Sequence, residues 1–568
     1  MNWTTLQTLT QNGEGFHLEF KSDQRKLADR ELIDTAVCLA NAQGGTLLIG
    51  VEDDGRITGL HPDHRANPLL LASFIASRTV PPLNITVEVI SSPDKSVQVA
   101  SLQIPAVAQP VATSDGRLLI RHLDTKGQPA CRPLYPNELQ SWQSDRGQTD
   151  TSAQLLPNAS WDDFDPLEFA RLRRMIEQNH GDTTLLSLSD TEIARALGLT
   201  IWQNDKLIPT IAGLLLVGRE SALQSYLPTH EVAFQVLQNT DVLVNDFYHW
   251  PLLRLIERVL ESFSVRNEER ELNWGLFRIS VPAYDPRGFR EALNNAIIHR
   301  DYLRLGAVHV QLHTNRLTIS NPGGFMEGVR PDNLLSVDPR PRNPRLADCF
   351  KRIGLVERTG RGVSIIYNGQ LRNGRPAPSY ERSTETGVSV TLYGGPADLD
   401  FVQFVVAEEN QQQRPFTVGE LLVLDYVRQE RDLDTPTAAN LIQRPDTEAR
   451  IMLENLVENG LLERRGTCRA RTYHLSAGVY RQMGQPAAYV HTRGFEPLQM
   501  ENMIRQYVQA HGRITRRDVV ELCRVSPNQA GYLLKKLSEN NELELVGLGR
   551  NAFYQLKNGK QTRRYHNT

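Results

Sequence analysis

The chain has 568 residues, with 63 Lys and Arg against 66 Asp and Glu, and 40% of the residues are hydrophobic. This length predicts about three to five domains, and the ordinary composition excludes a chain that is disordered throughout. The strongest apolar run, 208–218, is too short to span a bilayer, and the N-terminus does not resemble a secretory signal, so we expect a cytoplasmic protein. Because the net charge is only −3, any binding to nucleic acid must come from local patches.

The cysteines are five in number, far apart in the sequence, and include no C-x-x-C pair. Such spacing suggests neither a zinc knuckle nor a disulfide framework. We therefore expect buried, reduced thiols at Cys38, Cys131, Cys349, Cys468 and Cys523.

The N-terminal part predicts a small α+β unit. Residues 17–21 alternate as an edge strand does, 30–42 have the apolar spacing of a helix, and 46–51 form a buried strand rich in branched residues. Asp54-Gly55 then predicts a type I′ hairpin turn.

Three short motifs follow one another in this part: E-F-K, then A-N-x-x-G-G, then L-L-I-G-V-x-D-D-G. The set resembles the Schlafen/AlbA-like domain of many bacterial regulators over about residues 14–140. This resemblance implies an association with nucleic acids.

One branch of the Schlafen relatives cuts RNA with a metal held by carboxylates, and two glutamates here have the spacing of that branch. A third oxygen ligand for Mg²⁺ or Mn²⁺ would come from the turn. The alternative, which we favour, is that Glu19 and Lys21 form an exposed strand pair and that Asp53 and Asp54 only make the turn. The residues of the nuclease alternative are Glu14, Glu19, Glu52, Asp53 and Asp54.

The amino-acid composition changes after the N-terminal part. Residues 143–166 are polar and predict a linker, and 167–199 predict helix, with a capping box at Ser189 and Glu192. The run Gly213–Gly218 has the glycine spacing of a P-loop but lacks its Lys and Ser/Thr, so we interpret it as a buried strand. Without a P-loop, a helicase is disfavoured.

A possible nucleotide site begins in the helical stretch 289–302. Glu291 and Asn295 are four residues apart and share one helix face, and His299 is next on that face. The amide oxygen can bind Mg²⁺, and the carboxylate can orient or deprotonate a water. The alternative is a solvated helix face.

The segments that follow favour the nucleotide site. Strands are predicted at 308–312, 317–320 and 387–393, and the second strand ends in Asn321-Pro-Gly-Gly324, where Asn321 could read an adenine edge. The segment 326–357 is rich in proline and arginine and predicts a lid. Arg358-Thr-Gly-Arg-Gly362 then places two glycines at a helix start, where phosphate can bind.

This order resembles the GHKL (gyrase, Hsp90, histidine kinase, MutL) ATP-binding fold. The phrases P-T-x-A-G-L-L-L-x-G, R-E-A-L-x-N-A-x-x-H-R-D-Y and I-S-N-P-G-G resemble a bacterial family of transcriptional regulators often labelled as RecG-type helicases. By resemblance, Glu291 activates water, Asn295 binds magnesium, Asn321 reads adenine, and Gly360 and Gly362 contact phosphate. The remaining cofactor contacts implied are His299, Gly323, Gly324, Arg358 and Arg361.

One departure from the GHKL pattern affects the adenine contact. The usual D-x-G-x-G is N-P-G-G-F here, so a carboxylate and the last glycine are missing. The resemblance therefore implies phosphate contact more strongly than adenine contact.

The C-terminal part contains the same layout twice. Helices are predicted at 418–428, from Thr435-Pro436 onward, and at 445–459; they precede a basic hairpin at 461–475, and 498–556 repeat the order. Three helices and a hairpin describe a winged helix-turn-helix, whose third helix enters the DNA major groove; such modules also serve as protein-interaction modules. The expected DNA contacts are Arg464, Arg465, Arg469, Arg471, Asn528, Gln529, Lys535 and Lys536.

The predicted fold class is therefore an α+β multidomain protein. Its expected parts are a Schlafen/AlbA-like domain (1–145), a linker and helical segment (146–200), a GHKL α/β sandwich (201–398) and two winged helices (415–485 and 495–560). We predict a regulator that binds ATP, Mg²⁺ and double-stranded DNA and forms a dimer or larger homo-oligomer. Two alternatives are an ATP-gated nuclease acting in phage defence and a DNA-binding scaffold without nucleotide.

Overall fold

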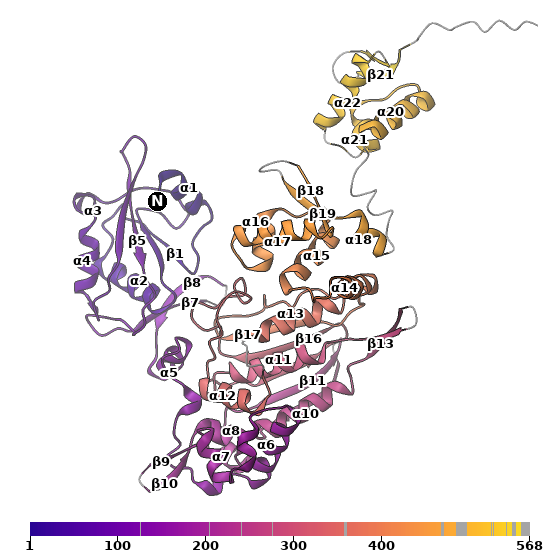
Figure 1. The fold of residues 1–568 in the computed structure, drawn as a ribbon. Coiled ribbons are helices and arrows are strands. Elements are labelled where there is room, and N and C mark those ends of the chain that lie inside the picture. The colour runs from indigo at the N-terminus through magenta and orange to yellow at the C-terminus, as the bar shows by residue number, and fades with distance from the viewer. Residues whose placement is uncertain are drawn as a thin grey trace, which may run out of the picture.

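The computed structural model describes most of the chain (Figure 1). The described residues are 1–124, 127–203, 205–239, 241–274, 277–356, 361–466, 471–483, 497–523, 525, 527–540, 542–547 and 552–557. Within these ranges, no helix is both long enough and apolar enough to cross a membrane.

The N-terminal unit is a four-stranded sheet in the order β1-β2-β5-β4, covered by the helix α2. The predicted strand at 17–21 is confirmed at the sheet edge, and the predicted helix at 30–42 packs its apolar side on the sheet. The elements are α1 (Trp3–Gln11), β1 (Leu18–Lys21), α2 (Asp29–Asn41), β2 (Gly45–Ile49), α3 (Pro62–Ala66), α4 (Leu70–Ser77), β3 (Thr79–Val80), β4 (Thr86–Ser91), β5 (Gln98–Ile104), β6 (Ala112–Thr113), β7 (Leu119–Leu123), β8 (Pro129–Pro133) and α5 (Pro136–Asp145).

The turn after β2 differs from the predicted type I′ turn. That type needs a positive φ at both central residues, and of Asp54 and Gly55 only Gly55 has one, at 82°. The Gly55 amide donates to the Glu52 carbonyl, so the turn runs from Glu52 to Gly55 with glycine as its last residue.

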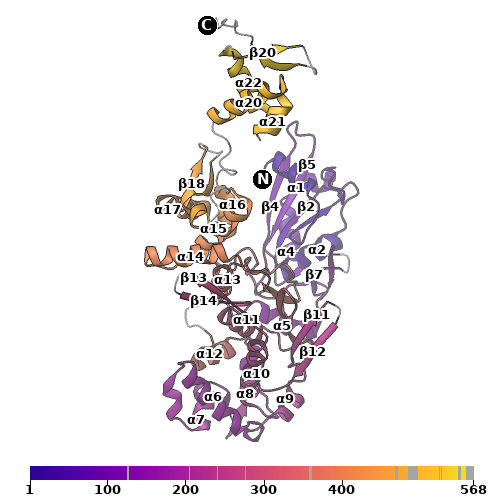
Figure 2. The same ribbon diagram turned by 90° about the vertical axis from the view of Figure 1, so that its right-hand side faces the viewer.

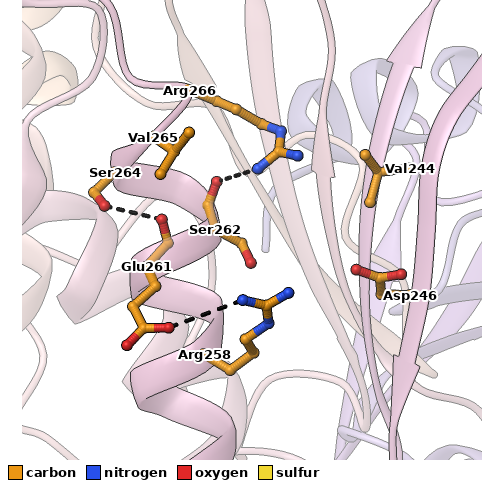
Figure 3. Close-up of a pocket in the computed structure, with 8 residues that line it drawn as sticks. All are labelled: Val244, Asp246, Arg258, Glu261, Ser262, Ser264, Val265 and Arg266. Atoms are coloured by element: carbon orange, nitrogen blue, oxygen red, sulfur yellow. Dashed lines mark hydrogen bonds and ion pairs between the residues drawn. The ribbon is translucent and has the colours of Figure 1, made fainter.

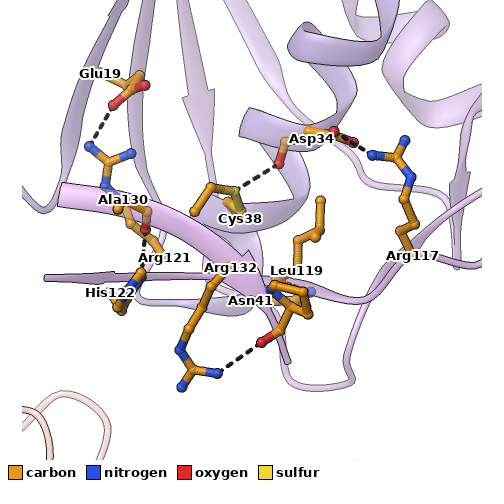
Figure 4. The surroundings of a disulfide bond; sticks show 12 residues. Glu19, Asp34, Cys38, Asn41, Arg117, Leu119, Arg121, His122, Ala130 and Arg132 are labelled. Carbon is orange, nitrogen blue, oxygen red and sulfur yellow. Dashed lines mark hydrogen bonds and ion pairs between the residues drawn. A yellow bond between two sulfur atoms is a disulfide. The ribbon is translucent and has the colours of Figure 1, made fainter. Parts of the chain in front are cut away.

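The expectation of reduced thiols is wrong for one pair of cysteines. Cys38 on the buried face of α2 and Cys131 on β8 form a disulfide, with their Cα atoms 6.0 Å apart (Figure 4). The sequence offered no motif for this pair because 93 residues separate the two positions. Cys349 and Cys523 are free and buried, as expected, and Cys468 lies outside the described residues.

The central unit is built on a five-stranded sheet in the order β12-β11-β15-β16-β17. Its strands predicted at 308–312, 317–320 and 387–393 are confirmed, and helices cover the apolar face of the sheet (Figure 1). The elements are α6 (Pro166–Gln178), α7 (Asp190–Ala196), β9 (Thr200–Gln203), β10 (Lys206–Pro209), α8 (Ile211–Val217), α9 (Glu220–Tyr226), β11 (Val232–Gln238), β12 (Asp241–Tyr248), α10 (Leu252–Ser264), β13 (Glu269–Trp274), β14 (Phe277–Pro282), α11 (Pro286–Ile298), β15 (Val308–Leu312), β16 (Arg316–Pro322), α12 (Pro344–Ile353), α13 (Gly362–Arg372) and β17 (Gly387–Tyr393), with 3₁₀ turns at Thr151–Ala153, Trp161–Asp163 and Thr183–Ser187.

Two expectations for the central unit need correction. The run 213–218, interpreted as a buried strand, is fully buried but helical, because Thr210 caps α8 by accepting a hydrogen bond from the Gly213 amide. Residues 143–166, expected as a linker, contribute Ala159 and Phe164 to the hydrophobic core shared with the sheet, while the helical segment predicted after them is confirmed by α6 and α7. The capping box at Ser189 and Glu192 is confirmed at the start of α7.

A buried histidine in the central unit predicts a pH-dependent stability. His230 is 1% exposed and donates from Nε2 to the Trp250 carbonyl at 2.8 Å, and burial lowers its pKa to about 4. Between that pKa and about 6.5 the unfolded chain binds the proton and the folded chain does not, so stability falls as the pH falls. We expect a loss of about 3 kcal/mol from this residue by pH 4.

Urea unfolding of wild type and His230→Gln, measured from pH 7 to pH 4, tests this expectation. The glutamine can still donate to the Trp250 carbonyl but does not titrate, so its unfolding free energy should depend less on pH. Identical pH dependence in the two proteins would contradict the assignment.

The C-terminal part contains two units with the same order of elements, three helices followed by a hairpin. Thr515 and Asp518 form a capping box with two reciprocal hydrogen bonds at the start of α21, and Asp434 caps α16. The elements are α14 (Leu399–Gln412), α15 (Val418–Glu430), α16 (Thr435–Ile442), α17 (Asp446–Glu458), β18 (Leu462–Arg465), β19 (Thr472–Leu475), α18 (Ala477–Gln482), α20 (Pro497–His511), α21 (Arg516–Cys523), α22 (Pro527–Glu539), β20 (Leu543–Val546) and β21 (Phe553–Leu556).

Candidate functional site

A cavity of about 900 Å³ lies in the central unit. Its walls come from α11, the end of β16, the segment 326–341, α12 and the start of α13, and the turn after α16 completes them. Much of the lining is aliphatic, including Ala292, Ile319 and Val390. A pocket of this size, with polar groups at a few places, is typical of a site for a small organic ligand.

The face of α11 predicted from the sequence lines this cavity. Glu291, Asn295 and His299 all contribute to the wall, while Leu293 and Ile297 on the opposite side are fully buried in the core. The Asn295 side chain is half-buried, and no described residue hydrogen-bonds to it. The helix thus presents a carboxylate and a free amide to the same space.

The third residue of that face is a neutral histidine. Burial and the neighbouring Arg342 guanidinium lower the pKa of His299 to about 4. At neutral pH the imidazole therefore carries no charge, and it can hydrogen-bond a ligand but adds no positive charge to the cavity.

Gly362, predicted as a phosphate contact, is the first residue of α13. A methyl group at Gly362 would overlap with the Glu291 carboxylate, so the helix start lies directly against this side chain. Gly362 also lines the cavity, as does Arg361. Two other predicted phosphate contacts, Arg358 and Gly360, lie outside the described residues.

Gly362→Ala should therefore damage the site without damaging the fold. Alanine favours the helix, so thermal stability should be unchanged or slightly higher. The added methyl displaces the Glu291 carboxylate, and a misplacement of about 1 Å can lower turnover by about 10²-fold. Turnover at this site and the melting temperature of the variant should separate in this way, and full turnover would contradict the contact.

The other predicted glycines have a structural explanation. Gly323 has a φ of 96°, and a Cβ at Gly324 would overlap with the Glu385 carbonyl, so both glycines are needed by the packing of the chain. Gly324 nevertheless lines the cavity. The Asn321 amide nitrogen donates to the carbonyls of Pro322 at 3.0 Å and Gly323 at 3.4 Å. Only its oxygen therefore remains to accept a hydrogen bond from a ligand.

Four cations lie around the cavity. They are exposed, and within the described part of the chain none of their side chains forms an ion pair or a hydrogen bond. The four are Arg340, Lys351, Arg361 and Arg444. Unpaired cations gathered around one cavity favour an anionic ligand, because phosphate oxygens can satisfy guanidinium and ammonium groups together.

Sequence reasoning selected only Arg361 of these cations as a ligand contact. Arg340 and Lys351 lay in the predicted lid, but many arginines there left no reason to select them. Arg444 is more than 80 residues further along the chain than Arg361, and no local pattern connects it to the site.

Of the segment 326–357 predicted as a lid, residues 344–353 instead form α12 and pack in the hydrophobic core, and the loop before this helix is held at both ends. The fully buried Arg342 donates to the carbonyls of His299 at 2.9 Å and Gly324 at 2.8 Å and pairs with Asp145 at the end of α5. The Glu327 amide donates to the Asp145 carbonyl at 3.0 Å. The segment between these anchors lines the cavity, as a lid would.

A second, smaller cavity of about 390 Å³ lies between β12 and α10 (Figure 3). It differs from the larger cavity in the partners of its cations. Its cations are engaged: Arg258 pairs with Glu261 at 3.9 Å, and Arg266 donates to the Ser262 carbonyl at 2.8 Å. It therefore lacks the free charge that the larger cavity offers.

Three carboxylates of the nuclease alternative, Glu14, Glu19 and Glu52, have protein partners. Glu19 pairs with Lys21 at 2.7 Å and with Arg121 at 2.6 Å, and its side chain is only 14% exposed, so the pair is not the exposed strand pair we favoured (Figure 4). Arg121 on β7 covers it. Glu14 accepts a hydrogen bond from the Phe20 amide at 2.8 Å, and burial raises the pKa of Glu14.

The remaining nuclease candidates do not complete a metal site. Glu52 accepts hydrogen bonds from Ser22 at 2.9 Å and from Thr58 at 2.6 Å. Asp53 lies close enough to Glu14 to raise its pKa. Across the described ranges, no three His, Cys, Asp or Glu side chains are arranged to hold a metal ion.

The basic residues expected at DNA lie on the two C-terminal units. Arg464 and Arg471 of the first hairpin both pair with Glu454 of α17, at 3.3 and 3.2 Å, and Arg465 lies 4.0 Å from Glu463. In the second unit, Lys535 and Lys536 lie on α22 with Gln529; Lys535 is 3.7 Å from Glu539, and Lys536 is 2.8 Å from Glu501. Arg469 and the Asn528 side chain lie outside the described residues.

Three family models match parts of the chain. Residues 14–130 match "Schlafen, AlbA_2", residues 306–392 match "Putative ATP-dependent DNA helicase recG C-terminal", and residues 140–233 match a domain of unknown function (DUF8451). The second range begins after α11, so Glu291 and Asn295 lie outside it. The third range includes much of the segment expected as a linker.

The solved structure of the DIP2311 protein from Corynebacterium diphtheriae aligns over 95% of this chain and 94% of its own, with 23% identity and a TM-score of 0.49. No curated protein sequence matches the chain. The chain thus contains a Schlafen AlbA_2 domain and an ATPase-like domain related to the RecG C-terminal model.

Proposed function

We propose that this protein binds ATP with Mg²⁺ in the large cavity, binds duplex DNA through its C-terminal units, and acts as a transcriptional regulator. The observation that carries the nucleotide part is the group of four cations, without a partner among the described residues, around a largely aliphatic cavity. The aliphatic walls suit a base, and the cations suit phosphates. The ATPase-like match over 306–392 supports the same ligand.

The side chains of α11 suit the chemistry of ATP. The free amide of Asn295 offers one oxygen ligand, which fits Mg²⁺ because this ion is commonly held by few protein oxygens, with phosphates and waters as its other ligands. When bound, the ion neutralises phosphate charge. Glu291 would accept the proton of the attacking water, and the Asn321 oxygen would accept a hydrogen bond from the adenine amine. In this proposal the cavity is an ATP-binding site of the GHKL type.

The DNA part rests on the repeated three-helix and hairpin layout. We propose that both units are winged helices, with α17 and α22 in the major groove and the basic hairpins on phosphates. Closure of the lid over ATP would bias the arrangement of subunits in a dimer or larger homo-oligomer. The paired carboxylates of the N-terminal unit give no support to cleavage of nucleic acid.

Asn295→Ala tests the nucleotide site. Loss of the only protein oxygen proposed for Mg²⁺ should weaken ATP binding about tenfold or more in the presence of Mg²⁺, which corresponds to about 1.4 kcal/mol. Binding measured with EDTA should differ little between the two proteins.

Isothermal titration calorimetry of the full chain gives both values. Asn315→Ala, in the exposed turn between β15 and β16, is the matched control and should bind as wild type does. A wild type that binds no ATP would favour the nucleotide-free scaffold, and an Asn295→Ala variant with unchanged Mg²⁺ dependence would place the metal elsewhere.

A further inference from the structure

The turn between α16 and α17 has an unusual residue at its centre. Gln443 ends α16 with a φ of 55° and a ψ of 44°, and the amides of Gln443 and Arg444 donate back to the carbonyls of Asn440 and Ala439. This is a Schellman-type helix end, in which the left-handed position is most often glycine. A glutamine there is strained, so its side chain is expected to serve another purpose.

The Gln443 side chain bonds directly to the predicted lid. Its oxygen accepts a hydrogen bond from the Leu335 amide at 2.7 Å, and its Nε2 donates to the Pro331 carbonyl at 3.0 Å. Leu335 also packs against the hydrophobic core of the first C-terminal unit. The tip of the lid is thus attached to the turn between two helices of that unit.

The next residue of the same turn reaches the cavity. Arg444 lines the wall, is exposed, and within the described ranges has no side-chain partner. It is the one cation of the four that comes from the C-terminal part of the chain.

A second connection runs through α13. This helix begins at the cavity with Gly362, and its buried Tyr367 and Leu371 belong to the core of the first C-terminal unit. Figure 2 shows α15, α16 and α17 beside α13 and α14. The helix α13 therefore belongs both to the wall of the cavity and to the hydrophobic core of the first C-terminal unit.

We propose that Arg444 is a phosphate-binding residue of the nucleotide site and that the Gln443–Arg444 turn couples nucleotide occupancy to the position of α16 and α17. This inference rests on the proposed nucleotide site and deepens it. A triphosphate in the cavity would pair with Arg444, and the turn would then hold the helical unit and the lid together. Without the phosphate, only the Gln443 bonds and core packing hold them.

Arg444→Ala tests the phosphate contact. It should weaken binding of ATP with Mg²⁺ about tenfold, because a charge-assisted hydrogen bond is lost, and leave binding of adenosine unchanged. Arg444→Lys keeps the charge and should recover part of the affinity. Arg450→Ala changes an exposed arginine on α17 that is outside the cavity lining and has no partner among the described residues; it is the matched control and should bind as wild type does.

Hydrogen–deuterium exchange tests the coupling. ATP with Mg²⁺ should slow exchange of the amides at 333–337 and 440–449 in wild type and in Arg450→Ala. In Arg444→Ala, at a nucleotide concentration that gives equal occupancy, this protection should be absent at 440–449.

The outcomes separate the two ideas. If wild type binds ATP and Arg444→Ala binds it equally well, the inference is overturned while the nucleotide site stands. Equal protection of 440–449 in both proteins at equal occupancy would overturn the coupling. If wild type binds no nucleotide at all, the proposed function itself fails, and this inference fails with it.

Discussion

Glu291→Gln is expected to abolish ATP hydrolysis and to leave ATP binding nearly unchanged. The glutamine keeps the shape of the side chain against Gly362 but cannot accept the proton of the attacking water. General base catalysis contributes typically 10²- to 10⁴-fold, so turnover should fall by at least about 100-fold. Phosphate release measured under single-turnover conditions gives this number directly.

The control for this substitution is Glu381→Ala, an exposed carboxylate outside the cavity, which should hydrolyse ATP as wild type does. A Glu291→Gln protein with wild-type turnover would remove Glu291 from the chemistry. Loss of both binding and turnover would instead assign it a structural role at the start of α13.

Reversing the charge of four basic residues in the C-terminal units should weaken duplex DNA binding by roughly 100-fold or more at low salt. Each phosphate contact that is lost should also lower the slope of log affinity against log salt by about 0.9, so the defect should shrink as salt rises. The substitutions to glutamate are at Arg464, Arg465, Lys535 and Lys536. Fluorescence anisotropy with a labelled duplex at several salt concentrations measures both quantities.

A control with the same change in net charge reverses four exposed basic residues of the central unit. These are Arg195, Lys206, Arg287 and Arg382. The control should bind DNA nearly as wild type does. If the C-terminal variant binds as well as this control, the DNA contact lies elsewhere, and the N-terminal Schlafen AlbA_2 domain is the next place to test.

Local pattern predicted which side of α11 faces the cavity. The spacing of Glu291, Asn295 and His299 placed them on one face of α11, and this face lines the cavity because its opposite side is apolar and packs on the sheet. Gly362 was predicted as a phosphate contact, and the structure adds the carboxylate against which it packs.

Contacts between distant segments could not be predicted in the same way. An apolar run such as 211–217 has no polar alternation to distinguish strand from helix, and a capping threonine decides for helix. The polar stretch 143–166 predicts a linker, yet Asp145 and Asp150 in it bond to Arg342 and to the start of α12. Arg444 joins the cavity only because two units share a wall, and single-sequence periodicity contains no information on such packing.

The most direct test of the account is a crystal structure of the full chain with a non-hydrolysable ATP analogue and Mg²⁺. The account predicts the triphosphate among Arg340, Lys351, Arg361 and Arg444, the metal on the Asn295 oxygen, and the base against the aliphatic wall near Asn321. An empty cavity at saturating analogue, or the nucleotide bound elsewhere on the chain, would contradict it.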